Sequence, residues 1–263
     1  MMREYGVELE FSSDWNVLCK YAKPYIRDVY GPRSSYAKKD RFDSETQLNK
    51  WHLKEENCEQ SELCTPVFVL DEFEEVLAVL DGLFKESDLE VSAYDGFHVH
   101  VDVSDLAPEH IIVCWLMIEQ DLLKCFPPDR RKNSNCVQLM PLGSKNKKPL
   151  ISERLKEAYD VSTSYGNANL DFEYYDDRKT VEVRLAEGTK DIDFVEAWIY
   201  FLDDFFYFAS QMSPTWSVCE KVNSKTFEEI AYYGQYDTKW LEKMLKRKKL
   251  YQRKRKLSLG FEL

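Results

Sequence analysis

The fold is decided by the stretch Asp95-Gly96-Phe97-His98-Val99-His100-Val101-Asp102-Val103. Apolar and polar residues alternate along it, and this period of two predicts a strand with one apolar and one polar face. On that strand His98 and His100 point the same way, so two of the chain's four histidines share one patch. A solvated sheet surface is the simpler interpretation of a lone polar face. Two imidazoles at this spacing favour a site, because imidazole is a common metal ligand and can donate to phosphate oxygens.

Two other stretches show the same alternation. Gly6-Val7-Glu8-Leu9-Glu10-Phe11 places Glu8 and Glu10 on one face, and Thr180-Val181-Glu182-Val183-Arg184-Leu185 places Glu182 and Arg184 together. Each stretch alone is more typical of a strand with one solvent-exposed face. If the strands join one sheet with these faces aligned, they form a charged surface that can bind divalent cations and a polyphosphate. Mg²⁺ binds through carboxylates plus substrate phosphates, and the planar donor fork of arginine suits phosphate.

Two further segments add charged residues to this set. In Ser61-Glu62-Leu63-Cys64-Thr65-Pro66 the proline limits any strand to its beginning or to a sheet edge, and Glu62 could face the same surface. Arg130-Arg131-Lys132-Asn133 follows Pro127-Pro128 as a basic loop. This loop is either a solvated surface turn or a source of cations for a transferring phosphoryl group or an acidic substrate.

Composition bounds the class of protein. The 263 residues are 44% hydrophobic and 14% aromatic, which is enough for a sizeable core in one large domain or two small ones. A net charge of −11 excludes a molecule that binds nucleic acid through its overall charge. The seven cysteines are odd in number and scattered without a CxxC pair, which disfavours a disulfide framework or a structural zinc site and favours a reducing compartment. Without a signal peptide or a membrane-spanning apolar run, the chain is predicted to be cytoplasmic.

Helical spacing alternates with the predicted strands. Helices are expected in six segments: residues 71–86, where apolar residues recur at helical intervals, and residues 108–126, 152–159, 192–210, 226–232 and 238–254. A strand is expected over residues 169–174, forming a hairpin with the strand that carries Glu182. The aromatic residues of 192–210 are expected to be core. This order predicts an α+β fold with a mostly antiparallel sheet backed by helices.

The segment from Lys239 to Leu263 differs in charge from the rest. It contains ten Lys and Arg against two Glu, a net +8, so the remainder carries −19 for the chain to reach −11. A basic amphipathic helix is typical of a nucleic-acid, membrane or partner surface. A solvated terminal helix that also contacts the acidic body is the favoured interpretation.

The ordered set of motifs resembles the amidoligase family, a compact branch of the glutamine synthetase and glutamate–cysteine ligase superfamily. The motifs lie in the segments 6–11, 62–66, 96–102, 131–133 and 180–189, and the resemblance runs from about residue 4 to residue 202. It implies an ATP- and Mg²⁺-dependent carboxylate–amine ligase, with Mn²⁺ as an alternative metal. ATP would phosphorylate a carboxylate to an acyl phosphate, and an amine would displace the phosphate to give an amide or isopeptide bond. It also implies a glutamine synthetase-like core over residues 1–210 and a helical extension over 211–263, packed on the same domain.

The resemblance assigns a role to each matching residue. The implied metal ligands are Glu8, Glu10, Glu62, His98 and Glu182. The implied nucleotide- or phosphate-binding residues are His98, His100, Arg130 and Arg184. The implied catalytic residues are Arg131, Arg184 and Glu187. Such a set suits phosphoryl transfer, which depends mostly on positioning and charge neutralisation.

Two other classes of function stay open. A metal-dependent hydrolase could use the His-x-His strand with the carboxylates, although only His52 and His110 remain as further histidines. A non-catalytic protein could bind nucleic acid or another partner through its basic tail. Cys136 has no base partner identifiable in the sequence and is disfavoured as a nucleophile. No membrane partner is expected.

Overall fold

The computed structural model describes residues 2–13, 15–24, 50–57, 60–86, 88–92, 94–134, 136–139, 151–164, 167–173, 175–211, 226–234 and 239–258. The chain divides into two compact units. The first unit contains residues 1–102 and 186–195, and the second contains residues 103–185 and 196–263.

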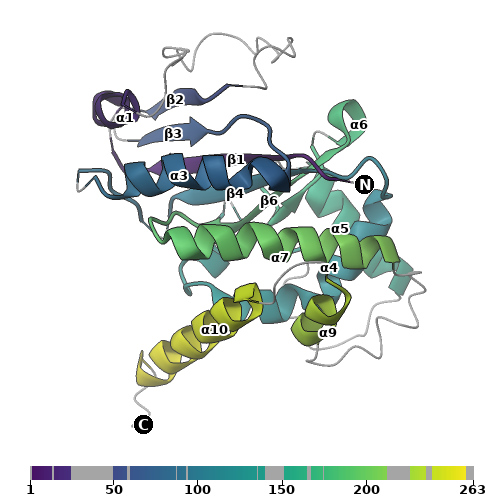
Figure 1. The fold of residues 1–263 in the computed structure, drawn as a ribbon. Coiled ribbons are helices and arrows are strands. Elements are labelled where there is room, and N and C mark those ends of the chain that lie inside the picture. Colours follow the sequence, from purple (N-terminus) through teal and green to yellow (C-terminus); the bar gives the residue numbers. More distant parts are fainter. Residues whose placement is uncertain are drawn as a thin grey trace. The chain divides into compact units, whose positions relative to one another are not determined.

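The first unit is built on a four-stranded antiparallel sheet (Figure 1). Its strand order is β2-β3-β1-β4. Its elements are β1 (Tyr5–Phe11), α1 (Trp15–Ala22), β2 (His52–Asn57), β3 (Gln60–Cys64), the 3-10 turn η1 (Leu70–Glu72), α3 (Phe73–Phe84) and β4 (Gly96–Asp102). Two of the three strands predicted from alternation, 6–11 and 96–102, are therefore neighbours in one sheet, and the segment around Glu62 is a further strand beside them.

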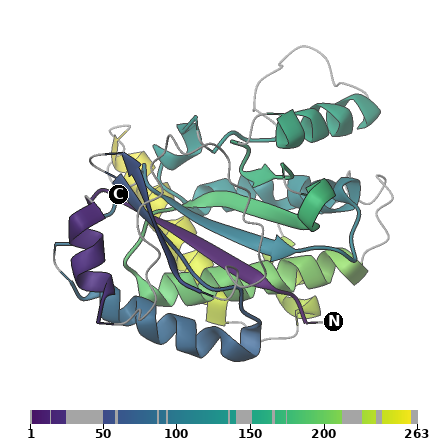
Figure 2. The same cartoon turned by 90° about the horizontal axis from the view of Figure 1, so that it is seen from above.

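The alternation of side chains along β1 directs one set of residues into the core and the other set to the polar face of the sheet. Its odd-numbered residues are buried and its even-numbered residues are partly exposed. Helix α3 lies along one face of the sheet in two perpendicular views (Figures 1 and 2). Phe73, at the start of α3, stacks on Phe68 with ring centroids 5.3 Å apart, and Phe68 in turn stacks on Tyr5. Burying one aromatic side chain such as Phe73 stabilises the fold by about 1.5–3 kcal/mol. A shift of β1 by one residue would expose its apolar side chains, so burial of these residues keeps Glu8 and Glu10 on the polar face.

The second unit is mainly helical. Its elements are α4 (Pro108–Leu122), the 3-10 turns η2 (Leu123–Cys125) and η3 (Arg130–Lys132), α5 (Ile151–Ser164), β5 (Leu170–Asp171), α6 (Tyr175–Arg178), β6 (Thr180–Glu187), α7 (Ile192–Gln211), α9 (Thr226–Tyr233) and α10 (Lys239–Ser258). Strand β6 and helix α7 each begin in one unit and end in the other. Strands β5 and β6 are antiparallel, with Leu170 opposite Val183 and Asp171 opposite Glu182.

Aromatic side chains make the core of the second unit. Trp198 and Phe201 of α7 stack with centroids 5.2 Å apart, and Phe201 contacts Trp240 of α10 edge-on at 5.1 Å. Trp240 Nε1 also donates a hydrogen bond of 2.7 Å to Asp204 Oδ2, between two buried side chains. The prediction that the aromatic residues of α7 are core is confirmed for Trp198, Phe201, Phe205, Phe206 and Phe208, while Tyr200 and Tyr207 are half-buried at the margin.

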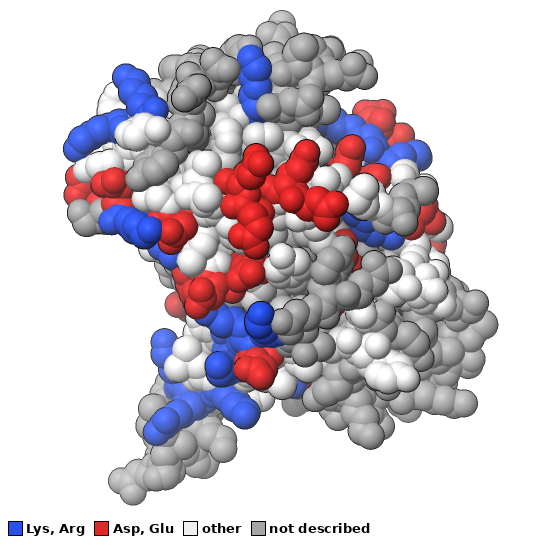
Figure 3. Space-filling model, in the orientation of Figure 1, with Lys and Arg blue, Asp and Glu red and all other residues white. Residues whose placement is uncertain are grey.

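Helix α10 presents two different sides. Trp240 and Met244 are buried, while Arg247 donates to the carbonyl of Cys125 and Lys248 lies 3.3 Å from Asp121. Among residues 239–254, whose burial is described, the exposed cations of the helix are Lys239, Lys246, Lys249, Arg253 and Lys254. Figure 3 shows blue side chains gathered over this helix. The favoured interpretation of a solvated basic helix that contacts an acidic residue of the body agrees with this placement.

The strand and helix predictions need three corrections. The strand expected over residues 169–174 is only Leu170–Asp171, because Asp171 Oδ1 accepts the backbone N–H of Glu173 and turns the chain away. The helix expected over 152–159 is longer, Ile151–Ser164. The helix expected from residue 238 starts at Lys239, and residue 238 lies outside the described residues.

The mixed α/β class with antiparallel strand pairs is confirmed. Helices α9 and α10 belong to the same compact unit as α4. A catalytic domain over 1–210 with an extension over 211–263 stays a proposal.

Candidate functional site

The sheet of the first unit brings three acids and two histidines together from three strands. Glu8 on β1 stands opposite His98 on β4, and Glu10 stands opposite Glu62 on β3. Directly opposite residues of an antiparallel pair share a face, so the acids and imidazoles meet on the polar side. This is the placement that the alternating sequences predicted for Glu8, Glu10, His98 and His100. Glu62, which could face the same surface, lies there as well.

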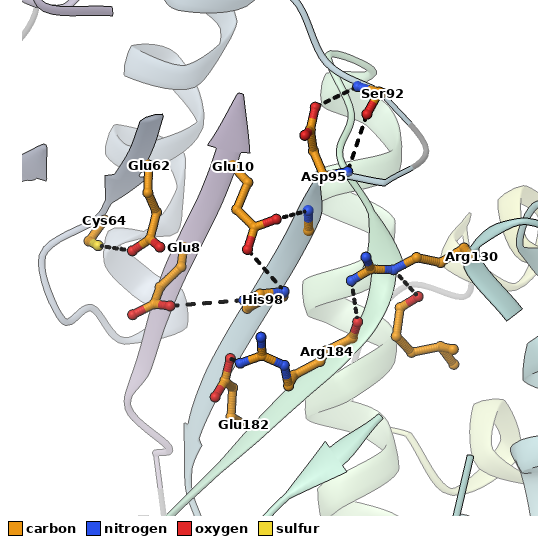
Figure 4. Close-up of polar contacts among 12 residues, drawn as sticks. Glu8, Glu10, Glu62, Cys64, Ser92, Asp95, His98, Arg130, Glu182 and Arg184 are labelled. Atoms are coloured by element: carbon orange, nitrogen blue, oxygen red, sulfur yellow. Dashed lines mark hydrogen bonds and ion pairs between the residues drawn. The ribbon is translucent and has the colours of Figure 1, made fainter. Parts of the chain in front are cut away.

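His98 lies between the two glutamates of β1 (Figure 4). Its Nδ1 is 3.9 Å from Glu8 Oε2, and its Nε2 is 3.7 Å from Glu10 Oε1. His100 Nε2 is 3.4 Å from Glu8 Oε1. The two histidines differ in environment, because His98 is only 2% exposed whereas His100 is half-buried. Each imidazole can therefore work together with a carboxylate in binding a cation or a phosphate.

Gly96 makes room for the His98 ring. A Cβ at residue 96 would lie 2.0 Å from His98 Nε2, far inside contact distance. The backbone N–H of Gly96 also donates a 2.5 Å hydrogen bond to Glu10 Oε2, which fixes that carboxylate at the start of β4 (Figure 4). The Gly-Phe-His order is thus explained by the packing of the histidine.

Cys64 joins the acids and was not predicted as a site residue. Its Sγ donates to Glu62 Oε1 at 3.0 Å, and one ligand atom each from Glu8, Glu62 and Cys64 lie within 4.8 Å of one another. Carboxylate oxygens suit Mg²⁺ or Mn²⁺, while a thiolate would favour a softer ion. Cys64 follows Glu62 at i+2, and this same-face spacing was the sequence signal that could have found it.

Asp95 holds the loop before β4. Its Oδ2 accepts a hydrogen bond of 2.6 Å from Ser12 Oγ. The same oxygen accepts the backbone N–H of Ser92, also at 2.6 Å (Figure 4). Its carbonyl accepts the N–H of Gly188 at 2.6 Å, where a Cβ would lie 2.7 Å from the Cβ of Asp95. This contact places the motif that contains Glu187, whose side chain is buried, against the start of the histidine strand.

In the second unit, Glu182 and Arg184 lie on β6 and form an ion pair. Arg184 Nη1 is 2.6 Å from Glu182 Oε1 (Figure 4). Arg184 is half-buried, and Glu182 is 6% exposed. The pair at i and i+2 therefore shares a face as predicted, and the arginine keeps the acid in a fixed position.

The two arginines of the basic loop differ in environment. Arg130 is 1% exposed, and its guanidinium donates to the backbone carbonyls of Arg184 and Leu185. Arg131 is half-buried, and its Nε and Nη2 donate to the carbonyl of Phe126. Arg130 therefore braces β6 beside Arg184, and Arg131 has the more accessible guanidinium of the two.

Asp171 is a further acid that the motifs did not identify. It stands opposite Glu182 on β5 and is 2% exposed. Burial, together with the nearby Glu182 carboxylate, raises the pKa of Asp171 to about 6. By contrast, burial raises the pKa of the Cys136 thiol to about 11, so the thiolate needed for a nucleophile is disfavoured.

The described part of the chain contains no helix long and apolar enough to cross a membrane. Neither the curated proteins nor the solved structures give a match to the chain. A protein-family model described as "Putative amidoligase enzyme" matches residues 1–206, which include every residue of the site described above. The chain therefore belongs to the amidoligase family.

Proposed function

We propose that the protein is an ATP- and Mg²⁺-dependent carboxylate–amine ligase that forms an amide or isopeptide bond through an acyl phosphate. Membership of the family implies an amide-forming ligase with carboxylate and amine substrates in general. The ATP dependence, the metal, the glutamine synthetase-like core and the cytoplasmic location are parts of the proposal. The observation that carries it is the group of Glu8, Glu10, Glu62, His98 and His100 on one face of the first unit's sheet.

The residues of this group fit a hard divalent cation. Glu8 and Glu62 present oxygen atoms within 4.8 Å of each other, a spacing that one ion can bridge. Glu8, Glu10, Glu62 and His98 would hold the metal in the first unit, and Glu182 is the proposed ligand in the second. When bound, the metal neutralises charge on the phosphates of ATP.

The cationic residues have complementary proposed roles. Arg184, held by its ion pair with Glu182, would bind phosphate or the substrate carboxylate through its planar donors. Arg131 would stabilise the transferring phosphoryl group. Arg130 would act by bracing the β6 backbone, because its guanidinium is buried against carbonyl groups. Glu187 would orient substrate from the buried motif next to Asp95.

Nucleotide binding is the first test. Calorimetric titration with ATP and Mg²⁺ should give binding that requires Mg²⁺ and is weakened in Glu8→Gln. Glu4→Gln is the matched control, since this exposed acid lies just before the same strand. Binding would lead to a screen for ADP release over pairs of acids and amines.

Failure to bind ATP at millimolar concentration, in a folded sample, would contradict the ligase. The hydrolase is the second candidate, favoured by the Glu8, Glu62 and Cys64 group, which could hold a metal that activates water. Hydrolysis that depends on Mn²⁺ or Zn²⁺ and is lost in Glu8→Gln would then identify it.

A further inference from the structure

Asp171 and Glu182 are two buried carboxylates that face each other on neighbouring strands. They are register partners of β5 and β6, and they are 2% and 6% exposed. Directly opposite residues have Cβ atoms about 4.5–5.5 Å apart, and like charges at this position destabilise a sheet. The fold therefore keeps together two acids that would repel each other if nothing compensated them.

The hydrogen bonds of Asp171 leave one oxygen for a ligand. Oδ1 accepts the backbone N–H of Glu173 at 2.8 Å. Oδ2 is buried and accepts no hydrogen bond within the described part of the chain. A buried carboxylate oxygen in this state loses its hydration without replacement, which is unfavourable. A cation bound at Oδ2 would offset that loss.

The local cation does not compensate both acids. Arg184 donates to Glu182 Oε1 at 2.6 Å, so this ion pair is with one of the two acids. The hydrogen bond that Asp171 accepts comes from a neutral backbone N–H, that of Glu173. Within the described residues, no hydrogen bond to Asp171 therefore brings a positive charge to its carboxylate.

We propose that Asp171, through Oδ2, is a divalent-cation ligand that binds Mg²⁺ or Mn²⁺ together with Glu182. Carboxylate oxygens are the ligands that these hard ions prefer. The inference rests on the proposed function in one respect, because the ligase assigns Glu182 to the metal. It adds a ligand from β5, a strand that carries none of the family motifs.

Mn²⁺ binding to the full-length chain tests the proposal. Free Mn²⁺ is measured by electron paramagnetic resonance during a titration, and the melting temperature is measured with EDTA and with Mn²⁺. Asp171→Asn should weaken Mn²⁺ binding by at least about tenfold and should reduce the Mn²⁺-induced rise in melting temperature. Asp177→Asn is the control, because Asp177 is an exposed acid of α6, the short helix between β5 and β6, and it should behave as wild type.

A purely structural Asp171 gives a different result. Asp171→Asn would then lower the melting temperature equally with EDTA and with Mn²⁺, and its Mn²⁺ affinity would stay within about twofold of wild type; that outcome overturns the proposal. Asp171→Ser, a smaller uncharged residue, provides a second variant if the asparagine variant does not fold.

The same samples separate this inference from the ligase. If Glu8→Gln weakens Mg–ATP binding but Asp171→Asn leaves Mn²⁺ binding unchanged, only the assignment of Asp171 fails. If wild type binds Mn²⁺ through Asp171 but binds no ATP, the ligase fails and the metal ligand stands. If wild type binds neither Mn²⁺ nor ATP, both fail.

Discussion

Gly96→Ala should displace His98 without unfolding the sheet. The added Cβ would lie 2.0 Å from His98 Nε2 and 2.7 Å from Cδ2, whereas carbon contacts lie at about 3.5–4.0 Å. The ring must therefore move by about 1.5 Å. Because His98 is buried, it must leave its place between Glu8 and Glu10. A functional site tolerates displacements of about 0.5 Å, so this shift exceeds the tolerance.

The expected loss falls on binding rather than on stability. Misplacing one ligand should weaken Mg–ATP binding by about 10–100-fold, or roughly 1.4–2.8 kcal/mol. A strained His98 rotamer costs about 0.5–1.5 kcal/mol, while replacing glycine by alanine stabilises by about 0.4–1 kcal/mol through the unfolded chain. These two terms nearly cancel, so the melting temperature should change little.

Calorimetric titration of Mg–ATP, paired with thermal melting, measures both quantities. Gly6→Ala is the matched control, because a Cβ there meets no atom closer than His100 Cβ at 3.9 Å. The control should bind as wild type. If Gly96→Ala also binds as tightly as wild type, the reasoning is refuted, since His98 would either have room to move or take no part in binding.

Three other expectations follow from buried groups. Trp240→Phe removes the indole donor to Asp204 and should lower the free energy of unfolding, measured by urea titration, by about 1.5–3 kcal/mol. The control Tyr232→Phe, at an exposed position, should change it by less than about 0.5 kcal/mol. Burial raises the pKa of Asp171 from 3.8 to about 6, so its contribution to stability is complete below about pH 3.8 and is lost as the pH rises through about 6. With EDTA present, melting temperatures between about pH 4 and pH 7 should fall less in Asp171→Asn than in wild type, and an equal fall would contradict the shift. Cys136→Ala should bind Mg–ATP as wild type, because burial raises the pKa of that thiol to about 11; a large loss would return Cys136 to the site.

The first half of the site could be predicted because period two is a local property. Val7, Leu9 and Phe11 must be buried, so Glu8 and Glu10 must face the other way, whatever strands lie beside them. The same rule placed His98 and His100. Composition does not predict which strands pair. Three alternating segments, each with acids or histidines on one face, nevertheless led to the expectation that these faces lie on the same side of one sheet.

The different environments of Arg130 and Arg131, and the place of Asp171 opposite Glu182, escaped prediction because they depend on contacts distant in sequence. Arg130 and Arg131 are adjacent and chemically alike, and only the carbonyls of β6, more than 50 residues away, bury the first of them. Asp171 lies on a strand of two residues, too short for any periodicity, and its partner Glu182 is recognisable only from the register. Alternation and motifs therefore identify strands that are long enough to show a period of two. They miss residues whose position depends on contacts with segments distant in sequence.

The hydrogen bond between Asp204 and Trp240 has a consequence for how the family diverges. Asp204 lies inside the matched residues 1–206, whereas Trp240 lies outside them. An acid buried without its indole donor is costly, so the two positions should be inherited together. Homologous chains that replace the tryptophan should also replace the acid, and those with a shorter C-terminus should carry an apolar residue in its place. Covariation between these positions would show that the segment beyond residue 206 has evolved together with the residues that match the family model, and not independently of them.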